Sequence, residues 1–161
     1  MPKTQASVTP PAHTPAGEGA EPTLLYLMKQ LELAIRSRLD DLFRPIGLTA
    51  LQYTALTVLE RRPDLSAAQL ARNSFVTTQT MADMVTSLEA RGLIERHRDP
   101  ADRRRLVLAL TADGWRLLSK YRIEVSALEG QMLSGLTAEE AVALRRTIQT
   151  CRSALAEHPQ A

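Results

Sequence analysis

Apolar side chains recur every three or four positions in several stretches of this chain, a spacing that places them along one face of an α-helix. The first stretch begins after Thr23 and ends near Arg44, before Pro45 and Gly47. Its apolar positions are Leu24, Met28, Leu31, Ile35, Leu39 and Leu42. The spacing predicts a long amphipathic helix that ends where proline and glycine stop it.

Two shorter helices are predicted next, each opening on a capping box, in which a Thr or Ser and a Gln three residues later bond each other's backbone. The pattern T-x-x-Q covers residues 49–52, and the helix behind it runs to about Arg61 before Pro63. The pattern S-x-x-Q covers residues 66–69, and its helix ends around Asn73.

A fourth helix and a strand hairpin follow. Thr77 can cap the helix, whose apolar positions are Met81, Met84, Val85 and Leu88, and Gly92 stands where a helix-ending glycine belongs. Beyond it, "LIERHR" and "RRLVLAL" flank a turn at "DPAD", and the second run alternates Leu106, Leu108 and Leu110 with Val107 and Ala109. The pattern predicts a two-stranded hairpin with a turn at its tip.

The last two predicted helices are long. Thr111 caps the first, which is apolar at Leu118, Tyr121, Val125, Leu128 and Met132 and is broken by Gly135. A capping box at Thr137 and Glu140 opens the second, which is apolar at Ala141, Leu144, Ile148, Cys151 and Leu155.

This order predicts a mainly α fold with a small β-hairpin wing: a winged helix-turn-helix between long terminal helices. We expect a flexible tail over 1–22, a dimerisation helix over 23–48, the winged unit over 49–111 and C-terminal dimerisation helices over 112–157. One small winged unit cannot cover the apolar stripes of three long helices. Two chains packing these helices together as a symmetric homodimer would cover them.

Composition changes this picture little. The chain has 161 residues, of which 44% are hydrophobic and 24% charged, as in globular proteins. Residues 1–22 contain five of the nine prolines and too few large apolar side chains to form a core. They also lack the apolar run of a secretory signal. No stretch approaches the ~20 apolar residues of a membrane span. Because Cys151 is the only cysteine, no internal disulfide is possible, and we expect a cytoplasmic protein that does not contact membranes.

Charge matters through its position, because the net charge is only +2. Five arginines fall within ten residues around the predicted turn: Arg96, Arg98, Arg103, Arg104 and Arg105.

The sequence does not favour an enzyme. The three histidines are scattered, and the sequence has no H-E-x-x-H, G-x-S-x-G or Gly-rich phosphate loop. We therefore expect no catalytic residues, no metal and no cofactor.

The chain resembles the MarR family of bacterial transcriptional regulators. The resemblance rests on "GLTALQYTALTVL", "LSAAQLARNSFVTTQTMADMVTSLEARGLIER" and above all "RDPADRRRLVLALTADG", and it covers roughly residues 24–155. It implies a homodimer that binds a palindromic operator in double-stranded DNA, most often as a repressor. Many family members release DNA when a small phenolic or aromatic acid binds between the dimerisation helices and the winged unit, and others respond to cysteine oxidation.

The helix behind Thr77 is the expected recognition helix. Thr77, Thr78, Gln79 and Thr80 are polar groups at a helix N-terminus, where backbone N–H groups favour phosphate. Thr77 is equally well explained as a cap alone. The resemblance places Gln79, Thr80 and Asp83 against base edges, although the acidic Asp83 is unexpected near phosphate.

At the wing, the resemblance makes Arg104 the residue that enters the minor groove, which attracts arginine where it is narrow. Asp102 would then brace an arginine, and Arg98, Arg103 and Arg105 would contact phosphates. His97 is interpreted as a strand residue near DNA. The competing interpretation, a winged helix used for protein–protein contact, gives the dense arginines no role.

The effector site is the least readable feature. Met28, Arg36, Tyr53 and Trp115 lie on elements that line the family's cleft, and together they would suit an aromatic carboxylate. Each could equally be a core or surface residue. Cys151 falls on an apolar stripe and is interpreted as a packing residue, with redox sensing as the alternative. For the protein as a whole, a redox-responsive or constitutive regulator is the alternative to a ligand-responsive one.

Overall fold

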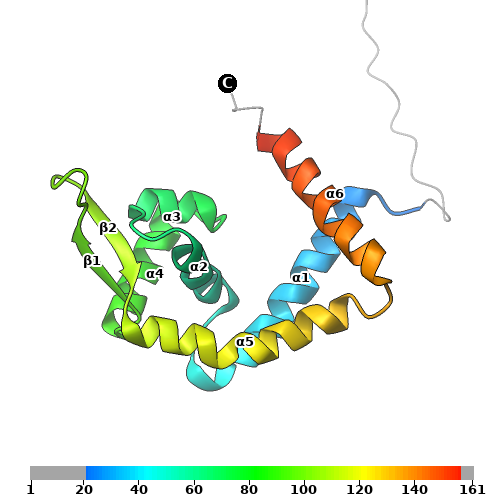
Figure 1. Ribbon diagram of the computed structural model, residues 1–161, viewed down its shortest axis with the longest axis horizontal. Coiled ribbons are helices and arrows are strands. Elements are labelled where there is room, and N and C mark those ends of the chain that lie inside the picture. The colour runs from blue at the N-terminus through cyan, green and yellow to red at the C-terminus, as the bar shows by residue number, and fades with distance from the viewer. Residues whose placement is uncertain (1–20, 157–161) are drawn as a thin grey trace, which may run out of the picture. The chain divides into compact units, whose positions relative to one another are not determined.

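The computed structural model describes residues 21–156 and divides the chain into two compact units, residues 1–34 and residues 35–161. Its elements follow the predicted order of four helices, a hairpin and two helices (Figure 1). The structure is mainly helical with one two-stranded antiparallel sheet in the described residues, which confirms the predicted fold class. The predicted flexible tail lies almost wholly outside the described residues.

Helix α1, Leu24–Phe43, ends as predicted, but the chain then makes a 3-10 turn, η1, at Arg44–Ile46 that contains Pro45. Gly47 closes this turn at φ +64°, a left-handed conformation that glycine adopts without strain. Asp40 of α1 then accepts a hydrogen bond from the backbone N–H of Ala50 at 2.6 Å, which fixes the start of the next helix to α1.

Helices α2 (Ala50–Arg61), α3 (Ala67–Asn73) and α4 (Thr78–Ala90) form the helical part of the winged unit. Both predicted capping boxes are present. Thr49 accepts from the backbone N–H of Gln52 at 3.1 Å and donates its own N–H to the Gln52 side chain at 3.0 Å, and Ser66 and Gln69 repeat this exchange. The caps satisfy N–H groups that would otherwise have no partner at each helix start.

The hairpin consists of β1 (Ile94–Arg98) and β2 (Leu106–Leu110), paired from Ile94 with Leu110 to Arg98 with Leu106. An isolated bridge from Leu65 to Leu108 ties the hairpin to the α2–α3 loop. Apolar alternation in β2 does not separate a buried from an exposed face. Val107 and Leu108 are both buried, whereas Leu106 at the outer end is 49% exposed.

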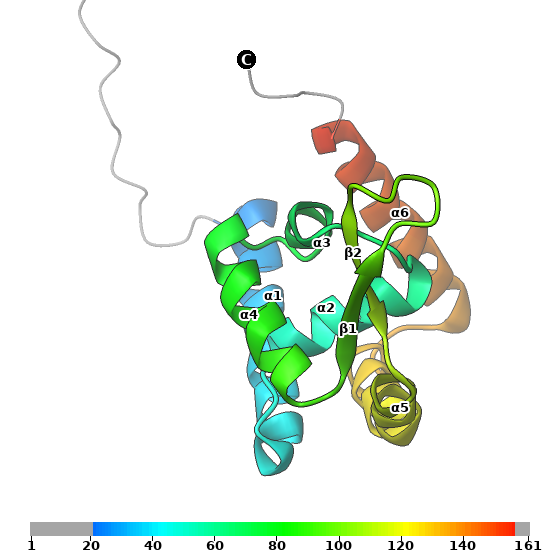
Figure 2. The same ribbon diagram turned by 90° about the vertical axis from the view of Figure 1, so that its left-hand side faces the viewer.

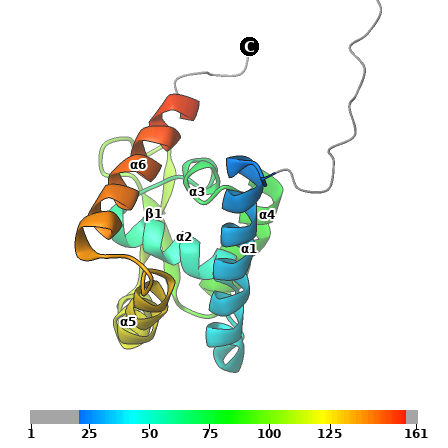
Figure 3. The same cartoon turned by 90° about the vertical axis from the view of Figure 1, so that its right-hand side faces the viewer.

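The core of the larger unit lies among the C-terminal end of α1, helices α2, α3 and α4, the hairpin and the first half of α5 (Ala112–Met132). Its fully buried side chains include Phe43, Leu56, Leu59, Leu70, Met81 and Leu88. Helix α5 buries Gly114 and Leu118 and then leaves this core. Helix α6 (Ala138–Ala156) turns away from α5 after a short loop and buries no residue (Figure 3). Cys151 is exposed in the single chain, so its interpretation as a packing residue stays a prediction that depends on the expected homodimer.

Candidate nucleic-acid interface

Helix α4 presents a polar face to solvent. Its apolar side chains at Met81, Met84, Val85 and Leu88 are buried, and all the residues predicted to contact DNA on this helix are exposed: Thr77, Thr78, Gln79, Thr80 and Asp83. Helix α4 and the hairpin lie on the same side of the winged unit (Figure 2). The predicted recognition surface is therefore accessible next to the wing.

Thr77 caps this helix, and its hydroxyl is thereby occupied. Its Oγ1 accepts from the backbone N–H of Thr80 at 3.1 Å and donates to the Thr80 hydroxyl at 2.9 Å. The backbone N–H groups of Thr78 and Gln79 have no partner in the described residues, so they remain open to an anion. The polar groups that can reach an outside partner are consequently those beyond Thr77.

The far end of α4 is held by Arg91, a residue that sequence analysis did not single out. Its guanidinium donates to the carbonyl oxygens of Gly47 at 2.9 Å and Ile46 at 2.6 Å. Nearby, Arg96 of β1 donates to both carboxylate oxygens of Glu89 at 3.0 Å. Arg96 therefore joins the hairpin to α4, and it is not one of the unpaired arginines of the wing.

The wing tip, residues 99–105, is closed by backbone bonds, and Asp102 acts there differently from the prediction. Its carboxylate accepts from the backbone N–H of Arg104 at 3.0 Å, and its carbonyl accepts from the backbone N–H of Arg105 at 2.9 Å. It contacts no guanidinium in the described residues. Asp102 therefore shapes the turn that presents Arg104 instead of pairing with an arginine side chain.

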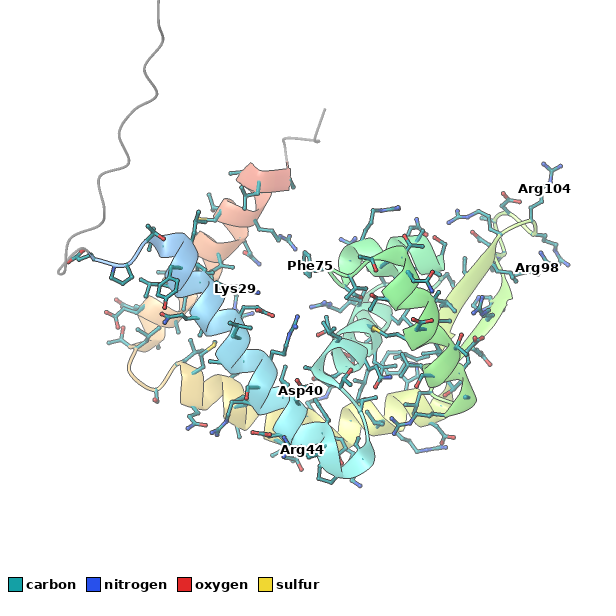
Figure 4. The ribbon with its side chains drawn as sticks, turned by 180° about the vertical axis from the view of Figure 1, so that it is seen from behind. Lys29, Asp40, Arg44, Phe75, Arg98 and Arg104 are labelled. Atoms are coloured by element: carbon teal, nitrogen blue, oxygen red, sulfur yellow. The ribbon has the colours of Figure 1, made fainter. Side chains whose placement is uncertain are left out.

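Arg103 and Arg104 carry the available charge of the tip. Neither guanidinium has a hydrogen bond or ion pair in the described residues, and Arg104 projects from the end of the hairpin in Figure 4. Arg98, at the start of the tip, donates one guanidinium N–H to the carbonyl of Arg103 at 3.3 Å. The Arg98 side chain points away from the hairpin, as that of Arg104 does (Figure 4).

Arg105, in contrast, is engaged within the protein. Its guanidinium lies 3.5 Å from the carboxylate of Asp99 and donates to the side-chain oxygen of Gln69 at 3.0 Å. The wing thus contains an aspartate–arginine pair, but the aspartate is Asp99 and not the predicted Asp102. The Gln69 contact anchors the wing to the start of α3. Gln69 was recognised only as a capping residue, and nothing in the sequence signalled its second partner.

His97 lies in β1 as predicted, and its side chain contacts the α2–α3 loop. Its Nε2 lies 2.8 Å from the carboxylate of Asp64, whose backbone adopts φ +63° and donates to the carbonyl of Leu108 at 3.1 Å. The pair fixes the hairpin to the helical part of the winged unit. His97 therefore helps to hold the hairpin in place against the helices.

Comparisons with known proteins identify the family of this chain. Residues 46–105 match the sequence profile of the MarR family. The HTH-type transcriptional repressor Rv2887 of Mycobacterium tuberculosis (strain ATCC 25618 / H37Rv) is 31% identical over 124 residues, which cover 77% of this chain and 89% of that protein. This chain belongs to the MarR family.

Solved structures extend the likeness to three dimensions. The repressor CouR of Rhodococcus jostii RHA1, solved bound to a 23-mer DNA duplex, is 27% identical with a TM-score of 0.71, over 81% of this chain and 92% of that one. PcaV of Streptomyces coelicolor, solved in complex with its natural ligand, is 26% identical with a TM-score of 0.66, over 82% and 93%.

Membership of the MarR family makes this chain a winged-helix, DNA-binding transcriptional regulator. Regulators of this family are not enzymes, which confirms the expectation drawn from the missing catalytic motifs. In the described residues no helix is both long enough and apolar enough to cross a membrane.

Of the four predicted effector residues of this MarR-family chain, Tyr53 is the most deeply placed. Its ring stacks on Phe43 at 4.5 Å between centroids. Burial raises the pKa of the Tyr53 hydroxyl above its usual 10.0, and the Glu60 carboxylate adds to the rise. Arg122 and Arg61 partly oppose that rise in pKa. Tyr53 is thus in large part a core residue.

The other three are more exposed. Trp115, in the first turn of α5, is 46% exposed and makes no ring contact in the described residues, and Arg36 on α1 is exposed. Met28 belongs to the smaller unit and is 48% exposed. A groove of about 560 Å³ does lie along α1 and α5, but it is lined by residues such as Arg38, Leu128 and Gln131 and by none of the four.

Proposed function

We propose that this protein acts as a homodimeric repressor that binds a palindromic operator and releases it when a small aromatic acid binds. The observation that carries the DNA-binding part is the hairpin tip with its two unpaired guanidinium groups, next to the exposed polar start of α4. Because helix-turn-helix dimers span successive turns of one DNA face, we expect half-sites about 10 base pairs apart.

In this proposal α4 enters the major groove. Gln79 can pair bidentately with adenine, and Thr80 and Asp83 lie on the same exposed face within reach of base edges. The open N–H groups of Thr78 and Gln79 suit a phosphate. Thr77 contributes by holding the helix start.

The wing supplies the minor-groove and phosphate contacts. Arg104 is free to enter a narrow minor groove, where the negative potential is strongest. Arg98 and Arg103 are assigned to phosphates. Arg105 is assigned to wing position instead, because Asp99 and Gln69 already engage its guanidinium.

The homodimer is supported by apolar side chains that one chain leaves uncovered. On α5 and α6, Ile123 is 80% exposed, Val142 60% and Leu155 79%. Exposed apolar surface of this extent typically marks an association site. A second copy offers the same stripes, so two chains can cover each other's helices by twofold symmetry.

The effector part rests on relatives. PcaV, which shares this fold and about a quarter of its residues, was solved with its natural ligand bound. A redox-responsive regulator is the second candidate, because the Cys151 thiol is exposed in the single chain. If the effector is a ligand, peroxide should not release DNA from the wild type. If Cys151 is the sensor, peroxide should release DNA from the wild type, and Cys151→Ser should abolish that release.

The deciding test is DNA affinity measured by fluorescence anisotropy on an operator selected from a random duplex library. Arg104→Ala should weaken binding by roughly tenfold to a hundredfold, the usual effect of losing one groove arginine, without changing the melting temperature. Arg96→Ala is the matched control, because Glu89 already holds that guanidinium. Equal losses in both variants would contradict the assignment of Arg104.

Salt dependence gives a second readout. If the dimer neutralises about six to ten phosphates, operator affinity should fall ~10³- to 10⁵-fold between about 50 and 200 mM salt. A protein–protein module with an adventitious basic wing would show no operator preference in competition with unrelated DNA. An operator affinity that does not change with salt concentration would contradict the DNA-binding proposal.

A further inference from the structure

Helix α5 begins inside the winged unit and continues beyond it. Its first turns bury Gly114 and Leu118 in the core, and the helix then runs without a break to Met132 (Figure 1). The orientation of the winged unit on this helix therefore depends on the contacts that α5 makes where it leaves the core. Two contacts with α2 lie at this point, one through aromatic rings and one through an ion pair.

The aromatic contact involves three rings from three helices. Phe43, the last residue of α1, is fully buried and stacks on Tyr53 of α2 at 4.5 Å between ring centroids. Tyr121 of α5 packs edge-on against the same Phe43 ring at 5.2 Å. Stacked and edge-on pairs are the arrangements that aromatic rings prefer. The rings thus join the first half of α2 to α5, but a single point of contact leaves α2 free to turn about it.

The ion pair lies at the other end of α2. The guanidinium of Arg122 on α5 donates to the carboxylate of Glu60 at 2.7 Å. The Glu60 side chain is only 22% exposed, so its carboxylate is partly withdrawn from water and depends on this partner more than a surface carboxylate does. Glu60 follows Tyr53 by two helical turns, which places the ion pair about 10 Å from the ring contact along α2.

The two contacts use successive residues of α5. Side chains of neighbouring residues on a helix diverge by about 100°, so Tyr121 and Arg122 point toward different parts of α2. Tyr121 reaches its first half through Phe43, and Arg122 reaches its last turn. Two separated points of contact resist a rotation that either one alone would allow.

We propose that Glu60 and Arg122 are positioning residues, whose ion pair holds the winged unit against rotation on α5 and thereby sets the half-site spacing that the dimer accepts. The spacing part rests on the proposed function, in which a twofold dimer presents two copies of α4. One added base pair moves a half-site by about 3.4 Å and turns it by about 35°. A dimer with fixed winged units loses contacts on such an operator, whereas winged units that rotate can follow the displaced half-sites.

The first test measures the orientation of the winged unit within one chain and needs neither DNA nor a dimer. Spin labels are attached at Thr86→Cys on α4 and Ser126→Cys on α5, two exposed positions, in a Cys151→Ser background. Double electron–electron resonance gives the distribution of label distances, and an excess of unlabelled protein restricts the signal to single chains. We expect Arg122→Gln to broaden this distribution. Equal widths with arginine and with glutamine at this position would overturn the proposal.

Two further substitutions show whether the pair itself is responsible. Glu60→Gln should broaden the distribution as Arg122→Gln does, and the double variant should be no broader than either one, because each removes the same interaction. Arg116→Gln is the matched control, since Arg116 also lies on α5 but pairs with Asp113 of the same helix. Equal broadening by Arg116→Gln would mean that any charge lost from α5 loosens the unit, and would contradict the role of Glu60.

The second test measures operator affinity on duplexes whose half-sites are moved together or apart by one base pair. The wild type should lose at least about tenfold on each, comparable with the loss of one base contact. Arg122→Gln should reduce this discrimination by about threefold to fivefold, the range open to a part-exposed ion pair, and should bind a single half-site as the wild type does. Weaker single half-site binding with unchanged discrimination would indicate a role in stability alone and contradict the proposal.

The two tests keep this proposal and the proposed function apart. If the wild type gains no affinity from a second half-site, the proposed dimeric function fails, and the distance distributions still decide whether the ion pair holds the winged unit. If the wild type discriminates between spacings and Arg122→Gln discriminates equally well, the proposed function stands and the role of the ion pair in spacing fails.

Discussion

Ser74 carries the buried hydroxyl that has no partner in the described residues. Its side chain is 2% exposed, and its Oγ makes no hydrogen bond. Because an unsatisfied buried hydroxyl costs roughly 1–3 kcal/mol, Ser74→Ala should stabilise the protein by about 1 kcal/mol in urea unfolding. Ser66→Ala is the control of opposite sign, since it removes the cap of α3 and should cost about 1 kcal/mol. A destabilised Ser74→Ala variant would show that the hydroxyl has a partner.

Tyr53 should make stability depend on pH in the alkaline range. Burial raises the pKa of its hydroxyl in the folded state above the usual 10.0, so the unfolded chain loses this proton first as pH rises. The contribution is fully present below pH 10.0 and is lost above it. Unfolding free energies measured across this range should fall less steeply for Tyr53→Phe. Identical slopes would argue against the raised pKa.

At the residue scale, sequence analysis predicted where the wing's side chains lie better than it predicted which of them form pairs. Motif and resemblance placed Arg104 at a free tip, where the structure leaves it unpaired. They also assigned Asp102 to an arginine, whereas its carboxylate binds a backbone N–H and Asp99 takes Arg105. Which of two aspartates three residues apart reaches a guanidinium depends on the conformation of the turn, which periodicity does not encode.

Gly114 sets how closely α5 approaches the base of the hairpin. A Cβ atom at this position would lie 2.2 Å from the carbonyl oxygen of Leu93. Gly114→Ala should therefore destabilise the protein by about 1–3 kcal/mol, although alanine favours helix elsewhere. Gly130→Ala is the control in the same helix, where nothing lies within 4 Å of the new atom and a gain of up to about 1 kcal/mol is expected. Denaturant unfolding of both variants tests the contact, and a stabilised Gly114→Ala would refute it.

At the element scale the prediction succeeded because local signals decide helix ends. The hydroxyls of Thr49, Ser66, Thr77 and Thr111 cap the helices expected of them, and Gly92 ends α4 at φ +68°. The face of β2 was less predictable. Val107 and Leu108 are both buried because α2 packs against this strand and the Leu65 bridge covers it, and such contacts come from distant sequence.

At the scale of the whole molecule, one chain leaves the apolar stripes of α5 and α6 exposed, as expected for helices that one winged unit cannot cover. Cys151 was expected to be packed, yet α6 buries none of its residues. A stripe of apolar residues shows that a helix needs a cover without showing which chain provides it. The Cys151 stripe is therefore explained only if a second copy covers it.

Ile148, on the same stripe as Cys151, allows the dimer to be tested. Ile148→Glu places a charge where the second copy should pack, and burying an unpaired charge is strongly unfavourable, so the variant should sediment as a monomer at micromolar concentration. Gln149→Glu adds the same charge one position away, off the stripe, and should remain dimeric. Because a monomer meets only one half-site, Ile148→Glu should also lose its preference for a palindrome over a single half-site, whereas Gln149→Glu should keep it. A dimeric Ile148→Glu variant with unchanged operator preference would show that α6 lies outside the subunit contact.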